Sequence, residues 1–178
     1  MALKPTIFKF NIALTDVDQQ QYLDLNLTVA QHPSETAERM MARVLAYCLN
    51  TSEGLEFARG LSTSDEPDIW LKSLDGRILK WIEVGEPSAE RLRKASHTAN
   101  EVLVYSFNTK SELWWSRSAA VISTARVHAV QFHWEGLTEL ATSIQRTLGL
   151  SITIVDQSAL IATDSKTIEV TWRILNQP

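Results

Sequence analysis

Apolar and polar positions alternate along the first thirty residues and predict two strands. Residues 6–14 carry spaced apolar side chains, and residues 21–29 place Leu23, Leu25, Leu27 and Val29 on one face. A period of two is typical of a half-buried strand. Turn-forming residues at 15–18 connect the two runs, so the pattern favours an antiparallel hairpin at the N-terminal end of the fold.

From residue 34 the period changes to that of an amphipathic helix. The apolar side chains recur at Ala37, Met40, Met41, Val44, Leu45, Cys48 and Leu49. This spacing predicts a helix over residues 34–49, with Ser34 as its N-cap. Glu38 lies at the edge of the apolar face. It either complements the helix dipole or supplies a carboxylate to a catalytic site.

The runs at residues 68–74 and 77–84 flank Asp75-Gly76. Asp-Gly between apolar-rich runs is a strong hairpin signal. A two-residue loop at Asp75-Gly76 places Trp70 opposite Trp81 and Asp68 opposite Glu83, whereas a three-residue loop would shift this pairing. Two carboxylates then face each other with their Cβ atoms roughly 4.5–5.5 Å apart.

Such a pair of carboxylates is unfavourable unless something compensates it. At about 5 Å and an effective dielectric constant near 20, the repulsion is roughly 3 kcal/mol, enough to raise one pKa by about 2 units. A shared proton, a neighbouring Arg or Lys, or a bound Mg²⁺ or Mn²⁺ would relieve the repulsion. Alternatively, the pair lies at a solvated strand end, where water screens it.

The remaining chain reads as alternating short elements. We expect a strand at 55–59, a basic helix at 87–98, a buried strand at 101–107, a helix at 110–120, a strand at 126–134, a helix at 137–148 ended by Gly149, and two or three short strands over 151–174. The basic helix carries Arg91, Arg93 and Lys94, for which a solvated face is the ordinary explanation.

Composition narrows the class of protein. A chain of 178 residues that is 44% apolar suits a single domain over residues 1–178. With one cysteine, no secretory leader and no long apolar run, we expect a soluble cytoplasmic protein without a membrane partner. The net charge of −4 argues against generic electrostatic binding of nucleic acid, although a local basic patch stays open. The four histidines lack metal-ligand spacing.

Three sequence blocks together resemble those of a known family. They are His32-Pro33-Ser34-Glu35-Thr36 with Glu38-Arg39-Met40-Met41, Asp65-Glu66-Pro67-Asp68 with Trp70, and Trp81-Ile82-Glu83-Val84-Gly85 with Pro87. With these blocks the chain resembles the bacterial YaeQ family over nearly its whole length. The order helix, three strands, helix, strand over about 34–107 resembles the core of the PD-(D/E)XK nuclease-like superfamily. The implied fold is α/β, with a restriction-endonuclease-like core, a mixed sheet and extra N- and C-terminal β-hairpins.

The superfamily resemblance implies a site and a chemistry. Asp68 and Glu83 would hold Mg²⁺ or Mn²⁺, which activates water for phosphodiester hydrolysis, and Glu38 or Glu35 would assist. Nucleic acid is the implied substrate. The superfamily's lysine is absent, because Gly85 stands two residues after Glu83.

Two functions follow, and the missing lysine leaves both open. Lys94 or Arg91 is the nearest replacement, whereas Lys72 lies about 13 Å along the strand from Asp68. One function is a metal-dependent phosphodiesterase or nuclease with Asp68, Glu83, Glu38 and Lys94 as catalytic residues. The other is a catalytically inactive nuclease-like module that binds or regulates.

Overall fold

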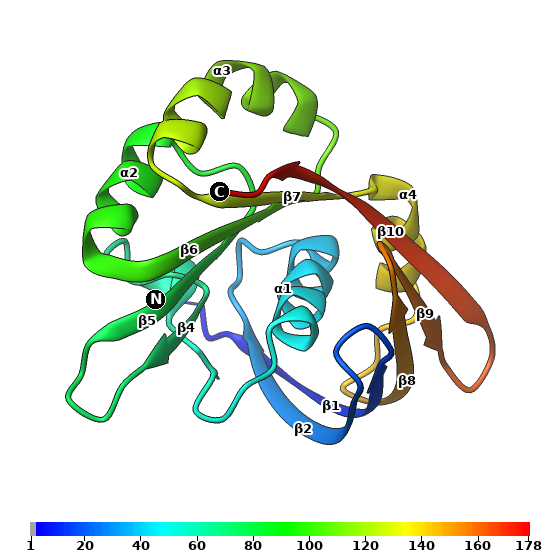
Figure 1. The fold of residues 1–178 in the computed structure, drawn as a ribbon. Coiled ribbons are helices and arrows are strands. Elements are labelled where there is room, and N and C mark those ends of the chain that lie inside the picture. Colours follow the sequence, from blue (N-terminus) through cyan, green and yellow to red (C-terminus); the bar gives the residue numbers. More distant parts are fainter. Residues whose placement is uncertain (1–2) are drawn as a thin grey trace. The chain divides into compact units, whose positions relative to one another are not determined.

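The computed structural model describes residues 3–178 and divides them into two compact units. One unit comprises residues 3–41 and 133–172, and the other comprises residues 42–132 and 173–178. Each unit combines helix and sheet, so the chain has a mixed α/β fold (Figure 1). Among residues 3–178, no helix is both long enough and apolar enough to cross a membrane.

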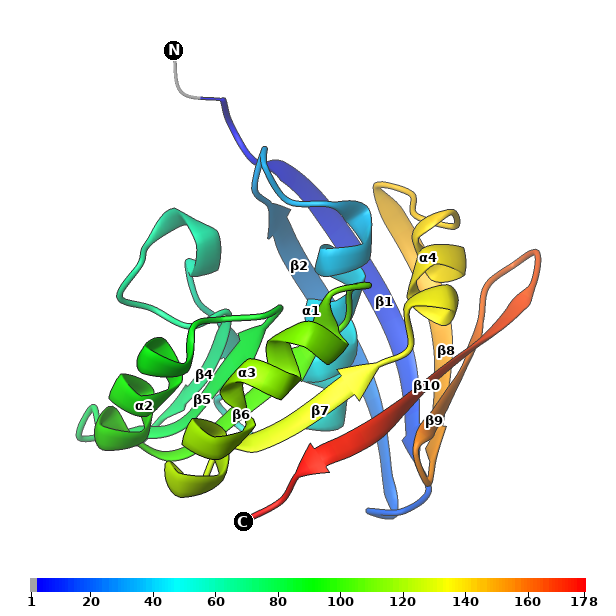
Figure 2. The same ribbon diagram turned by 90° about the horizontal axis from the view of Figure 1, so that it is seen from above.

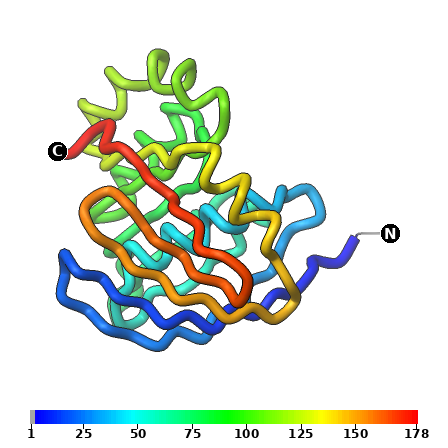
Figure 3. The backbone as a smooth tube through the Cα atoms, turned by 90° about the vertical axis from the view of Figure 1, so that its right-hand side faces the viewer, coloured from blue at the N-terminus to red at the C-terminus, as the bar shows by residue number. Residues whose placement is uncertain are grey.

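The first unit is built around strands in the order β2-β1-β8-β9-β10 (Figure 3). Its elements are β1 (Thr6–Asp16), β2 (Gln21–Gln31), the start of α1 (Ala37–Leu49), α4 (Trp134–Ala141), β8 (Thr147–Val155), β9 (Ser158–Ala162) and β10 (Thr167–Asn176). The predicted N-terminal hairpin is confirmed, since β1 and β2 pair antiparallel with Phe10 opposite Leu27. β8 runs parallel to β1, while β9 pairs antiparallel with both β8 and β10.

The second unit has the strand order β7-β6-β5-β4-β3. Its elements are the rest of α1, β3 (Glu56–Phe57), the 3-10 turn η1 (Gly60–Ser62), β4 (Ile69–Lys72), β5 (Ile78–Val84), α2 (Ala89–Thr98), β6 (Ala99–Ser106), α3 (Ser111–Thr124) and β7 (His128–Phe132). Pairing is antiparallel for β3-β4 and β4-β5, and parallel for β5-β6 and β6-β7.

Helices α2 and α3 pack on one face of this second sheet (Figure 2). The shared core contains Trp81, Leu92, Ala95, Val102, Val104, Ile122, Val127 and Ala129. Small side chains such as Ala95 let α2 approach the strands closely. The packing fixes the first turn of α2 beside β5, and that turn carries Arg91.

The β4-β5 hairpin reaches the predicted register by a different route. Ser73 and Arg77 close a three-residue loop, since the Ser73 N–H donates to the Arg77 carbonyl (2.9 Å) and Gly76 has φ +86°. Such a loop shifts the pairing by one residue, but a β-bulge between Leu71 and Lys72 shifts it back. Trp70 therefore lies opposite Trp81 as predicted.

The predicted helix over 137–148 is wrong in its second half. Helix α4 ends at Ala141, and Gly149 lies inside strand β8 opposite Asn11 instead of ending a helix. Residues 148–154 bury every second side chain, which is the period of a strand. A parallel partner, β1, stabilises that period.

The predicted N-cap of α1 is also wrong. The Arg39 N–H donates to the Thr36 hydroxyl (3.2 Å), so Thr36 caps the helix. The Ser34 hydroxyl instead contacts Nδ1 of His32 (2.7 Å). His32 and Pro33 thus belong to a turn that precedes the helix.

Candidate functional site

The structure brings Asp68 and Glu83, the acid pair, together in the second unit. Glu83 lies on β5, and Asp68 directly precedes β4, where its N–H donates to the Ile82 carbonyl (3.1 Å). Both residues are buried, with Asp68 2% and Glu83 5% exposed as whole residues. The alternative of a water-screened pair at a solvated strand end therefore does not apply.

Burial and like charge act on Glu83 in the same direction. Burial raises the pKa of the Glu83 carboxyl above its ordinary value, and the negative charge of Asp68 raises that pKa further. The Arg91 guanidinium and the hydrogen bond from Trp81 oppose this rise without cancelling it. Of the three forms of relief expected for such a pair, the described residues supply the neighbouring arginine.

Arg91 is positioned by the N-terminus of α2. Ser88 caps this helix, and its hydroxyl accepts a hydrogen bond from the Arg91 N–H (3.2 Å). The Arg91 side chain then reaches β5, where Nε lies 2.7 Å from Oε1 of Glu83. The Trp81 indole donates to the same oxygen (2.8 Å). Both donors therefore bind Oε1 of the Glu83 carboxylate.

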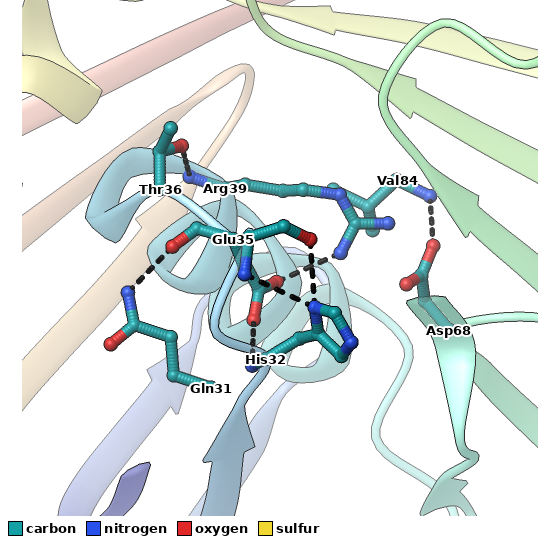
Figure 4. A network of polar contacts seen from close by, with 8 residues as sticks. Gln31, His32, Glu35, Thr36, Arg39, Asp68 and Val84 are labelled. Atoms are coloured by element: carbon teal, nitrogen blue, oxygen red, sulfur yellow. Dashed lines mark hydrogen bonds and ion pairs between the residues drawn. The ribbon is translucent and has the colours of Figure 1, made fainter. Parts of the chain in front are cut away.

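Asp68 is fixed by backbone contacts. Its Oδ2 accepts the Val84 N–H at 2.8 Å, which links the residue before β4 to the end of β5 (Figure 4). Gly60 packs against the same carboxylate, because a Cβ at that position would lie 2.8 Å from Oδ1. Gly60 also has φ +51°, so glycine suits the position on both grounds.

Gly85, at the position where the superfamily resemblance leads one to expect a lysine, has an unusual backbone conformation. Its φ of +120° is one that side-chain-bearing residues rarely adopt, although a Cβ there would meet nothing within 4 Å. The Gly85 N–H donates to the Tyr105 carbonyl (2.8 Å), which holds this backbone at the end of β6. A lysine at position 85 would therefore be disfavoured by backbone strain at this φ and not by a steric clash of its Cβ.

The two candidate replacements for that lysine differ in their contacts. Lys94 is exposed and forms an ion pair with Glu90 (3.3 Å), whereas Arg91 binds Glu83 of the acid pair directly. Both line a groove of about 530 Å³ along α2 and β5, whose apolar floor includes Trp81. Of these two basic residues, Arg91 is the one for which the structure describes a contact with Glu83.

The acids at the start of α1 belong to the first unit. Glu38 lies in the first turn of α1 and is half-buried, whereas Glu35 is buried. Oε1 of Glu35 binds the Arg39 guanidinium at 2.8 Å, and its Oε2 accepts the His32 N–H at 3.3 Å (Figure 4). Glu35 therefore holds the turn before the helix. Its polar neighbours Ser34 and Thr36 gave no indication that Glu35 is buried.

Glu86 is a polar residue whose role the sequence did not reveal. Its carboxylate accepts the N–H groups of Phe107 and Asn108 (both 3.2 Å), the Ser111 hydroxyl (2.7 Å) and the Asn108 amide. These contacts fix the turn between β6 and α3. They connect residues more than twenty positions apart, so no local pattern signals them.

The donor set of the acid pair fits a hard divalent cation. Mg²⁺ is commonly held by one or two carboxylates, with water and substrate phosphate completing its shell. Asp68 and Glu83 supply such oxygens, and sulfur and imidazole ligands are absent from the contacts described here for the pair. Residues 3–178 contain no group of three or more His, Cys, Asp or Glu side chains placed to hold a metal.

Comparison with known proteins gives the family. The family model described as YaeQ protein matches residues 1–172. The YaeQ protein of Escherichia coli (strain K12) is 37% identical over 180 residues, covering 100% of this chain and 99% of that protein, and the YaeQ protein of Salmonella typhi is 36% identical with the same coverage.

Solved structures agree with the sequence comparisons. The crystal structure of YaeQ from Xanthomonas axonopodis pv. citri matches with a TM-score of 0.94 and 32% identity, over 98% of this chain and 99% of that chain. YaeQ from Pseudomonas syringae matches with a TM-score of 0.93 and 35% identity, over 98% and 97%. The chain therefore belongs to the YaeQ family.

Proposed function

We propose that the protein is a metal-dependent phosphodiesterase of the nuclease-like type, with Asp68 and Glu83 as its metal ligands. One observation carries the proposal: two buried carboxylates from adjacent strands lie close enough for the charge of one to raise the pKa of the other. Perturbed acids brought together in this way are frequent at catalytic sites.

The order of the surrounding elements supports the same proposal. The chain runs α1, β3, β4, β5, α2 and β6, with an antiparallel meander followed by a parallel crossover strand. This order is expected for a PD-(D/E)XK core over about residues 34–107 in a single domain of residues 1–178. The superfamily placement and the single-domain organisation are part of the proposal.

The roles follow from the contacts of each residue. Asp68 and Glu83 would hold Mg²⁺ or Mn²⁺, which supplies positive charge and an activated water for attack on phosphorus. Arg91 is placed to stabilise negative charge on a phosphate, and Lys94 extends the positive side of the groove. The assisting role of Glu38, through the metal or a water, stays a prediction, because Glu38 belongs to the other unit. Nucleic acid is the proposed substrate.

A second function is favoured by specific observations. Arg91 already neutralises Glu83, and Gly85 cannot supply the missing lysine. Lysines on the β4-β5 hairpin and on α2 have partners of their own: Lys80 lies 3.6 Å from Glu101, Lys94 pairs with Glu90, and Lys72 lies over the Trp70 ring. The alternative is therefore a nuclease-like module that binds or regulates without catalysis.

Metal binding separates the two functions. Isothermal titration calorimetry with Mg²⁺ and Mn²⁺ would compare the wild type with Asp68→Asn and Glu83→Gln. Asp75→Asn is the matched control, since Asp75 is an exposed acid on the same hairpin, paired with Arg77. Binding that is lost in the first two variants and kept in the control supports a metal site at the acid pair.

Hydrolysis is then tested on three kinds of phosphodiester. The substrates are bis(p-nitrophenyl) phosphate, fluorescent single- and double-stranded DNA, and RNA, each with Mn²⁺. Turnover that requires both Asp68 and Glu83 supports the enzyme. Metal binding without turnover on any of them favours the inactive module, and the absence of binding at millimolar metal refutes the metal-dependent enzyme.

A further inference from the structure

Residues 58–67, the cover segment, leave the sheet between β3 and β4 and return beside the acid pair. The base of the segment is closed by two backbone hydrogen bonds, from Ala58 N–H to the Asp68 carbonyl (3.0 Å) and from Gly60 N–H to the Pro67 carbonyl (3.2 Å). Its interior is held by bonds such as that from the Thr63 N–H to the Gly60 carbonyl (3.0 Å). The segment is thus a small ordered excursion and not an open loop.

The cover segment contacts the acid pair directly at Gly60. The Cβ position of Gly60 lies 2.8 Å from Oδ1 of Asp68 and 3.7 Å from its Cα. Only a residue without a side chain allows the backbone to approach the carboxylate so closely. The cover segment therefore occupies one side of Asp68, and Asp68 is only 2% exposed.

The far end of the cover segment is tied down by Arg91. The three nitrogen groups of this guanidinium point to three different acceptors: Nε to Glu83 (2.7 Å), Nη1 to the Ser64 carbonyl, and Nη2 to the Glu66 carbonyl (2.8 Å). One planar cation thus joins α2, β5 and the cover segment. A lysine carries its three N–H donors on one nitrogen and lacks the planar fork that places separate nitrogens at the three acceptors.

We propose that Arg91 and the Glu83 carboxylate form a strap that holds the cover segment closed over Asp68, and that a divalent cation at the acid pair opens it. The opening step rests on the proposed metal-dependent function. A cation bound to Glu83 replaces the charge that Arg91 supplies and repels the guanidinium. Arg91 then loses the strongest of its three anchors, and its hold on Ser64 and Glu66 weakens.

This exchange would make metal binding precede substrate binding at the acid pair. Without a metal, the cover segment lies against Asp68, and the Arg91 guanidinium compensates the charge of Glu83. With a metal, the cover segment is free to move away, and Arg91 is free to contact an anionic substrate group in the groove that it lines with Lys94. The same residue would hold the site closed in one state and bind phosphate in the other.

Hydrogen–deuterium exchange of the full-length protein tests the strap. The readout is the exchange rate of peptides that cover residues 58–67, where the N–H groups of Gly60, Thr63 and Glu66 are hydrogen-bonded. The variants are Arg91→Ala, Arg91→Lys and Glu83→Gln. Lys94→Ala is the matched control, because Lys94 is one turn along the same helix and its ion pair among residues 3–178 is with the exposed Glu90.

Hydrogen–deuterium exchange of the metal-free protein tests whether Arg91 holds the cover segment closed. We expect about tenfold faster exchange of these amides in Arg91→Ala, as for the loss of charge-assisted hydrogen bonds. Arg91→Lys should resemble Arg91→Ala, and Glu83→Gln should give a smaller increase, because its amide oxygen still accepts one N–H but carries no charge. An unchanged rate in both Arg91 variants, or an equal increase in Lys94→Ala, overturns the strap.

The same exchange measurement with saturating Mg²⁺ tests whether the metal opens the cover segment. Calorimetry on the same samples measures Mg²⁺ binding. Faster exchange of the cover segment in the wild type, and no response in Glu83→Gln, supports opening. Metal binding with unchanged exchange overturns opening while leaving the proposed metal site intact. If the wild type binds no metal, the proposed function and the opening step both fail, whereas the Arg91 variants still decide closure.

Discussion

Replacing Arg91 with alanine should destabilise the protein by about 3 kcal/mol at pH 7. Removing one partner of a buried ion pair leaves an uncompensated charge and costs roughly 3–5 kcal/mol. The Glu83 side chain is 7% exposed, but that of Arg91 is 31% exposed, so solvent screening places the loss at the lower end. Water can replace the bonds to the Ser64 and Glu66 carbonyls, so they add little.

The deficit of Arg91→Ala should depend on pH with a definite sign. Without Arg91, the pKa of Glu83 rises further above 4.5, its ordinary value, because the guanidinium is the charge that lowers it. A carboxyl whose folded pKa exceeds its unfolded pKa binds more protons when folded, so stability falls as the pH rises from the unfolded towards the folded value. The stability deficit should therefore be small below pH 4.5. It should grow as the pH rises from the folded pKa of Glu83 in the wild type to the higher folded pKa of Glu83 in the variant.

Urea denaturation monitored by tryptophan fluorescence measures this effect between pH 4 and 8. The double variant Arg91→Ala/Glu83→Gln removes the buried charge and should recover about 1–2 kcal/mol relative to the sum of the single variants. Lys94→Ala should change stability by less than about 0.5 kcal/mol, since its pair is exposed. A loss below about 1 kcal/mol in Arg91→Ala with an unchanged m-value, or a deficit independent of pH, would refute the reasoning.

Three further predictions concern positions outside the ion pair. Gly136→Ala should lower stability by about 1–3 kcal/mol, because its Cβ would lie 2.6 Å from the Glu169 carbonyl oxygen, and an unchanged thermal midpoint would contradict this packing. Gly85→Ala should cost about 1–2 kcal/mol through backbone strain alone, since its Cβ would meet nothing within 4 Å, and an unchanged midpoint in the same denaturation assay would contradict this. Tyr105→Phe should cost about 1 kcal/mol, because the Asn50 amide loses its 2.7 Å bond to the hydroxyl, and a double variant with Asn50→Ala should show non-additivity.

The correspondence between sequence and structure is closest where a pattern is local. The hairpin of β1 and β2, helix α1 and strands β5 and β6 follow the periods of their apolar residues, and these periods need no distant partner. Where two periods compete, local information fails. The stretch before Gly149 contains apolar residues at both helical and strand spacing, and pairing with β1 selects the strand.

The acid pair shows the same division within the site. Neighbouring strands joined by a short hairpin are close in sequence, so the juxtaposition of Asp68 and Glu83 follows from the register. The hairpin has the three-residue loop, which by itself would shift the pairing, and a bulge restores the register because sheet pairing along the whole hairpin outweighs the preference of two turn residues.

The family, the mixed helix and strand content and the meeting of the two acids could all be predicted from the order of the amino acids. The group that compensates the acids depends on how α2 packs on the sheet. Arg91 follows Glu83 by eight positions and Ser64 by twenty-seven, and its three acceptors come together through the packing of α2 on the sheet. Periodicity reports which face of an element is buried, whereas a side chain that bridges three elements depends on distances that exist only once those elements have packed.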